Sequence, residues 1–129
     1  QLMPETAEKF GVDTTSTPQE NIAAGVKFLK VLDGQLRKKV TDDMERIKFV
    51  LAAYNVGIAH ILDAMRLAEK YGKNPAVWTG SVDYFILNKS NPDYYMDTVV
   101  RYGYARGEEP YRFVGEILQR YEKYKGAGN

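Results

Sequence analysis

The sequence predicts an all-α fold in a single domain over residues 1–129. Three observations support this prediction: apolar residues recur at helical spacing, no stretch of useful length alternates like a half-buried strand, and Gly and Pro residues divide the chain into short helices. A chain of 129 residues with 44% hydrophobic and 27% charged residues can bury one hydrophobic core. No internal repeat or interdomain linker interrupts the pattern.

Composition excludes several classes of function. The net charge is +1, from 18 basic and 17 acidic residues, so nothing favours nucleic acid or an anionic membrane as a partner. The absence of cysteine rules out disulfides, a thiolate nucleophile and Cys-based metal sites. No apolar run approaches the roughly 18 residues of a membrane span, and no signal peptide is present. Because the chain opens on Gln1, we expect a processed or truncated piece, which leaves room for a targeting segment upstream.

Two helices are predicted near the N-terminus. The first covers residues 4–10, with Pro4 in its first turn and Gly11 at its end. Thr17 and Glu20 then form a capping box that opens the second helix. The apolar face of this helix, ahead of Gly34, consists of Ile22, Val26, Leu29 and Leu32.

The stretch from Arg46 to Met65 is the predicted centre of the fold, as one helix or two. Thr41 is expected to cap it, and Gly57 offers a place to stop before the pattern resumes and ends at Tyr71. The expected apolar stripe is Ile47, Val50, Leu51, Tyr54, Ile58, Ile61, Leu62 and Met65, with Arg46, Lys48 and Asp63 reaching water and with small residues, Ala52 and Ala53, that let another backbone approach.

The second half of the chain is rich in aromatic residues. Asn91 reads as an N-cap with Pro at the first helical turn, and that helix is expected to end by Gly103 or Gly107. A last helix is predicted from Pro110, with fraying from Lys125 onward. Its apolar face consists of Val114, Ile117, Leu118 and Tyr121.

Two segments carry a resemblance to a known family. The run Gln1-Leu-Met-Pro-Glu-Thr-Ala7 resembles the second half of the "MQLMPxTA" signature, and Ala53-Tyr-Asn-Val-Gly57 matches the "AYNxG" signature, of family 1 lytic transglycosylases. Segments 62–75, 102–107 and 109–114 are most similar to the membrane-bound lytic transglycosylase F branch. The resemblance implies a lysozyme-like helical fold, of which residues 1–129 are the C-terminal part of the catalytic domain.

The resemblance implies a lyase acting on peptidoglycan. Such enzymes cleave the β-1,4 bond between N-acetylmuramic acid and N-acetylglucosamine without water, because the muramoyl C6 hydroxyl attacks C1 and leaves a 1,6-anhydro end. One carboxyl can protonate the leaving oxygen and then accept the C6 hydroxyl proton, which requires a raised pKa. In the family this carboxyl is a Glu upstream of the first signature, so we expect it upstream of Gln1 and absent from this chain. Glu5, Glu8, Glu45 and Glu69 are interpreted as solvated or dipole-complementing charges.

The supporting site residues follow from the same resemblance. Gln1 and Met3 match positions that line the substrate groove, and Tyr54 matches the tyrosine whose hydroxyl contacts the catalytic carboxyl. Asn55 matches the neighbouring signature residue, in the groove or bonding a helix end. From the pattern alone, Tyr54 and Asn55 equally suit helix-end carbonyls near the core.

The family often carries a Glu followed four residues later by a Tyr. Glu109 matches the first position as a substrate-binding residue, but Phe113 replaces the Tyr and a hydroxyl is lost. Tyr111 is a substitute substrate-binding candidate, although a displacement of two residues on a helix points it elsewhere. The other tyrosines suit both saccharide binding and helix packing.

No cofactor and no metal are expected. His60, the single histidine, is interpreted as a packed or surface residue, because no Cys or second His could join it around a metal. The expected partner is the peptidoglycan glycan strand, and the expected location is the periplasm, with attachment to the outer membrane only through regions outside this chain. Two alternatives stay open: a non-catalytic peptidoglycan-binding module and a helical interaction protein without a sugar ligand.

Overall fold

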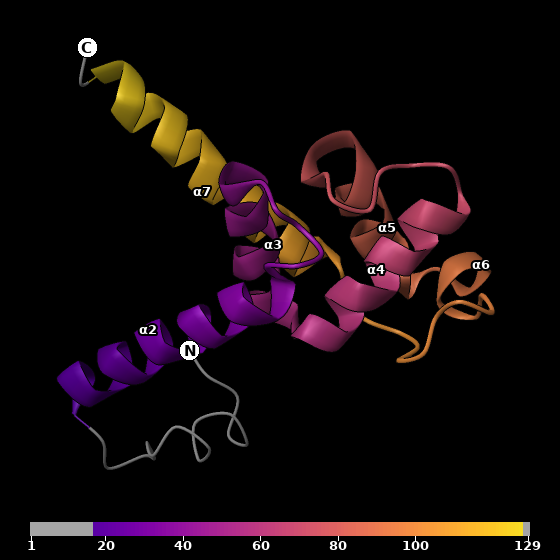
Figure 1. Cartoon of the computed structure of the whole chain (residues 1–129), viewed down its shortest axis with the longest axis horizontal. Helices are drawn as coiled ribbons and strands as arrows, with labels where there is room; N and C mark the ends of the chain where they lie inside the picture. Colours follow the sequence, from indigo (N-terminus) through magenta and orange to yellow (C-terminus); the bar gives the residue numbers. More distant parts are fainter. Residues whose placement is uncertain (1–16, 128–129) are drawn as a thin grey trace.

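The computed structural model describes residues 17–127, and within this range every regular element is helical (Figure 1). The all-α prediction is therefore confirmed for the described part of the chain, whereas the helix predicted over residues 4–10 lies outside it. The elements are α2 (Pro18–Leu36), α3 (Asp43–Val56), α4 (Ile58–Lys70), the irregular turn η1 (Trp78–Val82), α5 (Asp83–Leu87), η2 (Asn88–Ser90), α6 (Pro92–Tyr95) and α7 (Glu108–Ala127).

Helix α2 begins at the predicted capping box. The Glu20 N–H donates to Thr17 Oγ1 at 3.2 Å, and the Thr17 N–H donates to Glu20 Oε1 at 2.8 Å. The predicted apolar face is covered only toward its C-terminal end, where Leu32 is fully buried, while Ile22 is 68% exposed and Val26 is 46% exposed. The first turns of α2 therefore show apolar side chains to solvent within the described structure.

The predicted central stretch is two helices, α3 and α4, separated by Gly57. This residue has φ 99° and ψ 140°, a conformation that strains any residue with a Cβ, and its N–H closes α3 by donating to the Ala53 carbonyl at 2.8 Å. The predicted cap at Thr41 is wrong by one position, because the carboxylate of Asp42 accepts the Glu45 N–H at 2.9 Å. An ionised carboxylate makes the stronger cap at the positive end of a helix.

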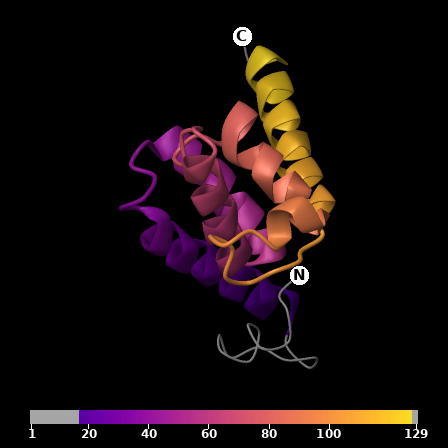
Figure 2. The same ribbon diagram turned by 90° about the vertical axis from the view of Figure 1, so that its right-hand side faces the viewer.

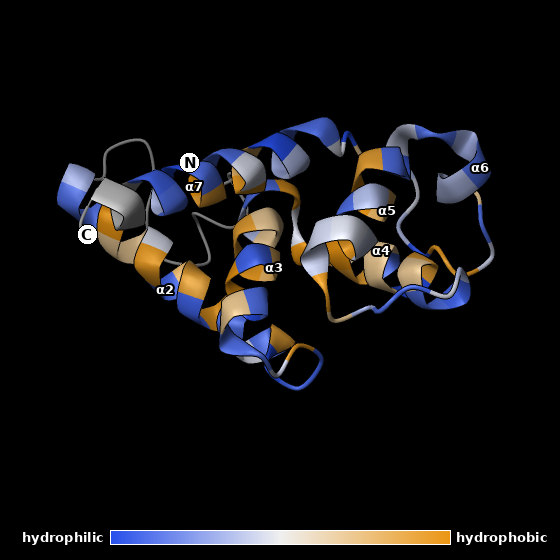
Figure 3. Cartoon of the chain, turned by 90° about the horizontal axis from the view of Figure 1, so that it is seen from above, coloured by the Kyte–Doolittle hydropathy of each residue, from blue (hydrophilic) through white to orange (hydrophobic). Residues whose placement is uncertain are grey.

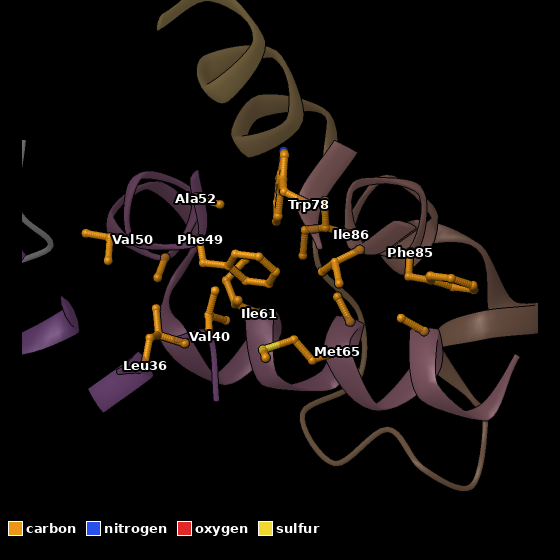
Figure 4. Close-up of a cluster of buried hydrophobic side chains, with 14 of the residues drawn as sticks. Leu36, Val40, Phe49, Val50, Ala52, Ile61, Met65, Trp78, Phe85 and Ile86 are labelled. Carbon is orange, nitrogen blue, oxygen red and sulfur yellow. The ribbon is translucent and has the colours of Figure 1, made fainter. Parts of the chain in front are cut away.

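Helix α3 lies between α2 and α7 and packs against both (Figures 1 and 2). Ala52 and Ala53 are fully buried within the core. The core continues past Phe49, whose ring meets Trp78 edge-on with centroids 5.4 Å apart, to Phe85 in α5 (Figure 4). Hydropathy colouring shows hydrophobic bands along α2, α3 and α4 and a largely hydrophilic α7 (Figure 3).

Arg46 was expected to reach water, and this expectation is wrong. Its side chain is buried because each part of the guanidinium finds an acceptor: Nε donates to Asp33 at 2.7 Å, Nη1 to the Val40 carbonyl at 3.0 Å, and Nη2 to Asp43 at 2.6 Å. The hydrogen bonds from Arg46, and then from Arg37, lower the pKa of the Asp33 carboxyl. Arg46 thus joins α2, the connection after it and the start of α3.

Asp63 was also expected to reach water, yet it is fully buried. Its carboxylate accepts from Lys89 Nζ at 2.6 Å, from the Arg66 guanidinium, and from the backbone N–H groups of Arg101 at 2.8 Å and Tyr102 at 2.9 Å. Burial by itself would raise the pKa of this carboxyl, but these hydrogen bonds lower it below its ordinary value. We call these five groups the Asp63 node, which ties α4 to η2 and to the segment before α7.

The C-terminal helices differ from the predicted bounds. Asn91 caps α6 as predicted, accepting the Asp93 N–H at 3.0 Å, but α6 ends at Tyr95, far before Gly103. Helix α7 begins at Glu108, two residues ahead of Pro110, and continues to Ala127 through the segment expected to fray. Its two N-terminal glutamates complement the helix dipole. None of the helices in the described range is both long and apolar enough to cross a membrane.

Candidate functional site

Tyr54 lies in the last turn of α3, where the break at Gly57 follows at once. Its ring is half-buried against Phe28 of α2, with centroids 5.6 Å apart and the planes tilted by 41°. The hydroxyl lies beside α2, 3.5 Å from the position that a Cβ on Gly25 would occupy. Within residues 17–127 this hydroxyl has no hydrogen-bond partner, so its O–H can donate to a group from elsewhere.

Asn55 follows on the exposed side of the same turn. At this helix end the Ala53 carbonyl accepts the Gly57 backbone N–H at 2.8 Å. The other two predicted groove residues, Gln1 and Met3, lie outside the described residues.

Glu109 and Tyr111 lie in the first turns of α7, and both are exposed. The start of α7 is fixed by Gly107, since a Cβ there would come within 1.6 Å of the Ile86 carbonyl oxygen. Phe113, at the position where the resemblance implies a tyrosine, is half-buried. Glu109 is therefore free to face a ligand, while Phe113 contributes to packing.

Tyr111 borders two surface hollows. One, of about 580 Å³, lies between η1 and α7 and includes Trp78 and Thr79. The other, of about 540 Å³, lies among the end of α4, α5 and α6 and includes Tyr71, Tyr84 and Tyr94. Neither of these two hollows is lined by Tyr54 or Asn55, so Tyr111 shares neither of them with the signature pair.

The carboxyls with shifted pKa values are poor general acids. Hydrogen bonds from Arg46 and Arg37 lower the pKa of Asp33, the Asp63 node lowers that of Asp63, and Lys70 followed by the Val99 N–H lowers that of Asp97 to about 2. A group that must donate a proton near neutral pH needs the opposite shift. These three carboxyls remain ionised.

Glu45 lies in the first turn of α3, where its charge complements the helix dipole as expected, but it is not a solvated charge. It is half-buried, accepts the Trp78 N–H at 2.8 Å with Oε1, and pairs with Lys48 Nζ at 2.8 Å through Oε2. The contact spans 33 residues of sequence, which local patterning could not reveal. Glu45 thus holds η1 against α3.

His60 is half-buried in the first turn of α4, in agreement with the interpretation as a packed residue. Burial and then the positive charge of Lys89 lower its pKa, so the imidazole is neutral at neutral pH. Its Nδ1 is buried and lacks a hydrogen-bond partner among the described residues. No group of three His, Cys, Asp or Glu side chains within those residues is arranged to hold a metal ion.

Sequence reasoning missed the Asp63 node, although one signal was present. The residues around Asp63 in α4 are Ile61, Ala64, Met65, Leu67 and Ala68, and all of them are buried. A carboxylate within so apolar a helix needs internal donors, because a buried charge without partners is costly.

Residues 1–77 match the family model described as the transglycosylase SLT domain. The membrane-bound lytic murein transglycosylase F of Pseudomonas fluorescens (strain Pf-5) is 41% identical over 121 residues, covering 94% of this chain and 24% of the relative. The protein of the same name from Maricaulis maris is 41% identical over 118 residues, covering 92% of this chain and 25% of the relative.

A third relative of that name, from Desulfosudis oleivorans, is 38% identical over 125 residues, covering 97% of this chain and 27% of the relative. The chain therefore spans about a quarter of the length of these curated relatives. The resemblance to family 1 lytic transglycosylases of the F branch is confirmed.

Proposed function

Because the chain belongs to the transglycosylase SLT domain family, we propose that it forms the groove-bearing part of a peptidoglycan lytic transglycosylase. The reaction is non-hydrolytic cleavage of the β-1,4 bond between N-acetylmuramic acid and N-acetylglucosamine, with 1,6-anhydro ends as products. The names of the relatives, membrane-bound lytic murein transglycosylase F, support murein as the substrate and the cell envelope as the location. Within the envelope, the periplasm is the proposed compartment.

The observation that carries this proposal is the hydroxyl of Tyr54, which is held in place and open to a partner. Its ring is fixed against Phe28, and its hydroxyl lacks a partner among residues 17–127. A phenolic O–H held in one place can donate to a carboxylate and fix its orientation, which is the role that the resemblance gives this tyrosine. Asn55, exposed beside it, is proposed to bond polar groups of the glycan, as are Gln1 and Met3 from the first signature.

The acid/base role is proposed for the glutamate that the family carries ahead of the first signature, and not for Glu5 or Glu8. That glutamate protonates the glycosidic oxygen as the C1–O bond breaks, and its carboxylate then accepts the proton of the C6 hydroxyl as the C6 oxygen bonds to C1. Asp33, Asp63 and Asp97 are excluded from this role by their lowered pKa values. Glu109, at the exposed start of α7, is proposed to contact the strand without acting as the acid.

The test is mass spectrometry of soluble products after incubation with purified sacculi. Two proteins are compared: this chain, and this chain joined to the segment that precedes the matched region in the Pseudomonas fluorescens relative. We expect muropeptides lighter by one water than the hydrolysis products from the joined protein, and none from the chain by itself. Reducing-end products from the joined protein would contradict the proposed reaction.

A non-catalytic peptidoglycan-binding module is the second candidate. The tyrosine-lined hollow near α6 favours it, since tyrosine rings and hydroxyls suit saccharide binding without bond cleavage. Binding of sacculi by the joined protein without any release of muropeptides would support this candidate instead.

A further inference from the structure

Four aromatic side chains pack together beside the end of α4. Tyr71 follows α4, Tyr84 and Phe85 belong to α5, and Tyr94 belongs to α6. Tyr71 stacks on Phe85 with centroids 5.9 Å apart and an interplanar angle of 17°. Tyr94 meets Tyr71, Tyr84 and Phe85 edge-on at 5.8, 6.0 and 5.9 Å. We call these four residues the aromatic cluster; each ring contacts at least two others, so their orientations are fixed.

The hydroxyls of the cluster are fixed as well. Tyr71 donates to Asp97 Oδ2 at 2.8 Å, and the Tyr84 and Tyr94 hydroxyl oxygens lie 3.2 Å apart. Whichever of these two hydroxyls donates, the other keeps its own hydrogen for a further acceptor. The hydrogen bond with Asp97 raises the pKa of Tyr71, and that with Tyr84 raises the pKa of Tyr94, so both phenols stay protonated at neutral pH.

The cluster forms one wall of the hollow of about 540 Å³ described above, which has the size of a small-molecule site. The remaining lining consists of Lys73, Gly80, Ser81, Asp83, Leu87 and Tyr111. Phe85 anchors the wall in the core, whereas Tyr71, Tyr84 and Tyr111 are 48%, 49% and 42% exposed. These three tyrosines line the hollow and keep accessible surface for a ligand.

The chemistry of this wall fits one class of ligand. An anion is disfavoured, because Asp83 stands at the rim with Lys73 and because the nearby Lys70 is already bound to Asp97. A purely apolar ligand would cover the remaining hydrogen of the Tyr84–Tyr94 hydroxyl pair without giving it an acceptor, which is costly. A pyranose offers a face of C–H groups to a ring and hydroxyl or acetamido groups at its edge, so it satisfies both parts of the wall.

We propose that this hollow is an accessory saccharide subsite that binds an N-acetylhexosamine unit of a glycan strand. The Tyr84 and Tyr111 rings contact the sugar face, and the Tyr84–Tyr94 hydroxyl pair bonds its edge. The identity of the sugar rests on the proposed function, but the subsite shares no lining residue with the surroundings of Tyr54. It holds the strand and takes no part in bond cleavage.

The test is an NMR titration of the ¹⁵N-labelled chain with chitotetraose. We expect shifts of the amides in residues 80–87 and 94, and binding weakened about fivefold or more by Tyr84→Ala. Tyr84→Phe keeps the ring and should weaken binding by a smaller factor. Because Tyr84 packs within the cluster, Tyr111→Ala serves as a second variant; it leaves the cluster rings in place and should also weaken binding.

Tyr121→Ala is the matched control, since Tyr121 is 50% exposed on α7 and does not line the hollow. If Tyr84→Ala and Tyr111→Ala both bind chitotetraose within twofold of this control, the proposed subsite is refuted. Absence of anhydro products in the sacculus assay would remove the proposed reaction and leave the subsite standing. If anhydro products appear but chitotetraose shifts only amides outside the hollow, the subsite is refuted and the proposed reaction stands.

Discussion

Replacement of Asp63 by Ala is expected to be among the most damaging single changes in the described structure. The carboxylate and the Lys89 ammonium that it binds at 2.6 Å have no exposed side-chain surface. The variant leaves that ammonium buried without its partner, which typically costs about 3–5 kcal/mol. It also removes the acceptor of the Arg101 and Tyr102 N–H groups, at about 1 kcal/mol each before relaxation. A loss of about 4 kcal/mol or more is a large part of a stability of roughly 5–15 kcal/mol.

The assay is urea unfolding followed by circular dichroism at pH 7, with Glu69→Ala as the control because Glu69 is exposed on the same helix. Pairing Asp63→Ala with Lys89→Met should recover at least about 2 kcal/mol relative to the sum of the single changes, since the unpaired charge is gone. Hydrogen exchange should show the Arg101 and Tyr102 amides less protected in Asp63→Ala. The reasoning is refuted if Asp63→Ala costs no more than Glu69→Ala.

Three further outcomes are expected. Gly107→Ala should destabilise the fold by about 3 kcal/mol or more, because the added Cβ would overlap the backbone of Ile86. Gly34→Ala in α2 is the control, since its Cβ would meet open space and should stabilise the fold by up to about 1 kcal/mol. Thermal unfolding of the two variants measures the difference. The lowered pKa of His60 means that the unfolded chain binds more protons, so stability should fall as pH drops below 6.5, and His60→Gln should flatten that part of the pH profile. Asp97, with a pKa of about 2 against 3.8, contributes stability that is present above pH 3.8 and lost as pH falls toward 2; Asp97→Asn should show no such loss in acid titrations of unfolding.

Local features of this fold could be predicted from the sequence. The capping box of Thr17 and Glu20 and the break at Gly57 depend on residues within one or two turns, and both are confirmed. The cap at Asp42 was missed by one position because Thr41 and Asp42 are both good caps, and only the strength of their hydrogen bonds separates them.

Long-range contacts could not be predicted in the same way. Arg46 and Asp63 were expected in water because charge is the local signal, yet their partners include Asp33, 13 residues away from Arg46, and Lys89, 26 residues away from Asp63. The same limit applies to the hollow beside the aromatic cluster, because its wall combines Tyr84 of α5 with Tyr94 of α6. The position of Tyr54 at a helix end was readable, because Asn55 and Gly57 mark that end in sequence.

The role of Tyr54 is the central claim, and its most direct test is the rate of anhydromuropeptide release by the joined protein. Tyr54→Phe removes the hydroxyl and keeps the ring against Phe28, so the fold should be retained. Loss of one hydrogen bond to a charged group corresponds to about 1.5–3 kcal/mol, or roughly 10- to 100-fold in rate. We expect that decrease for Tyr54→Phe and none for Tyr121→Phe; equal rates for both variants would show that the Tyr54 hydroxyl does not orient the catalytic acid.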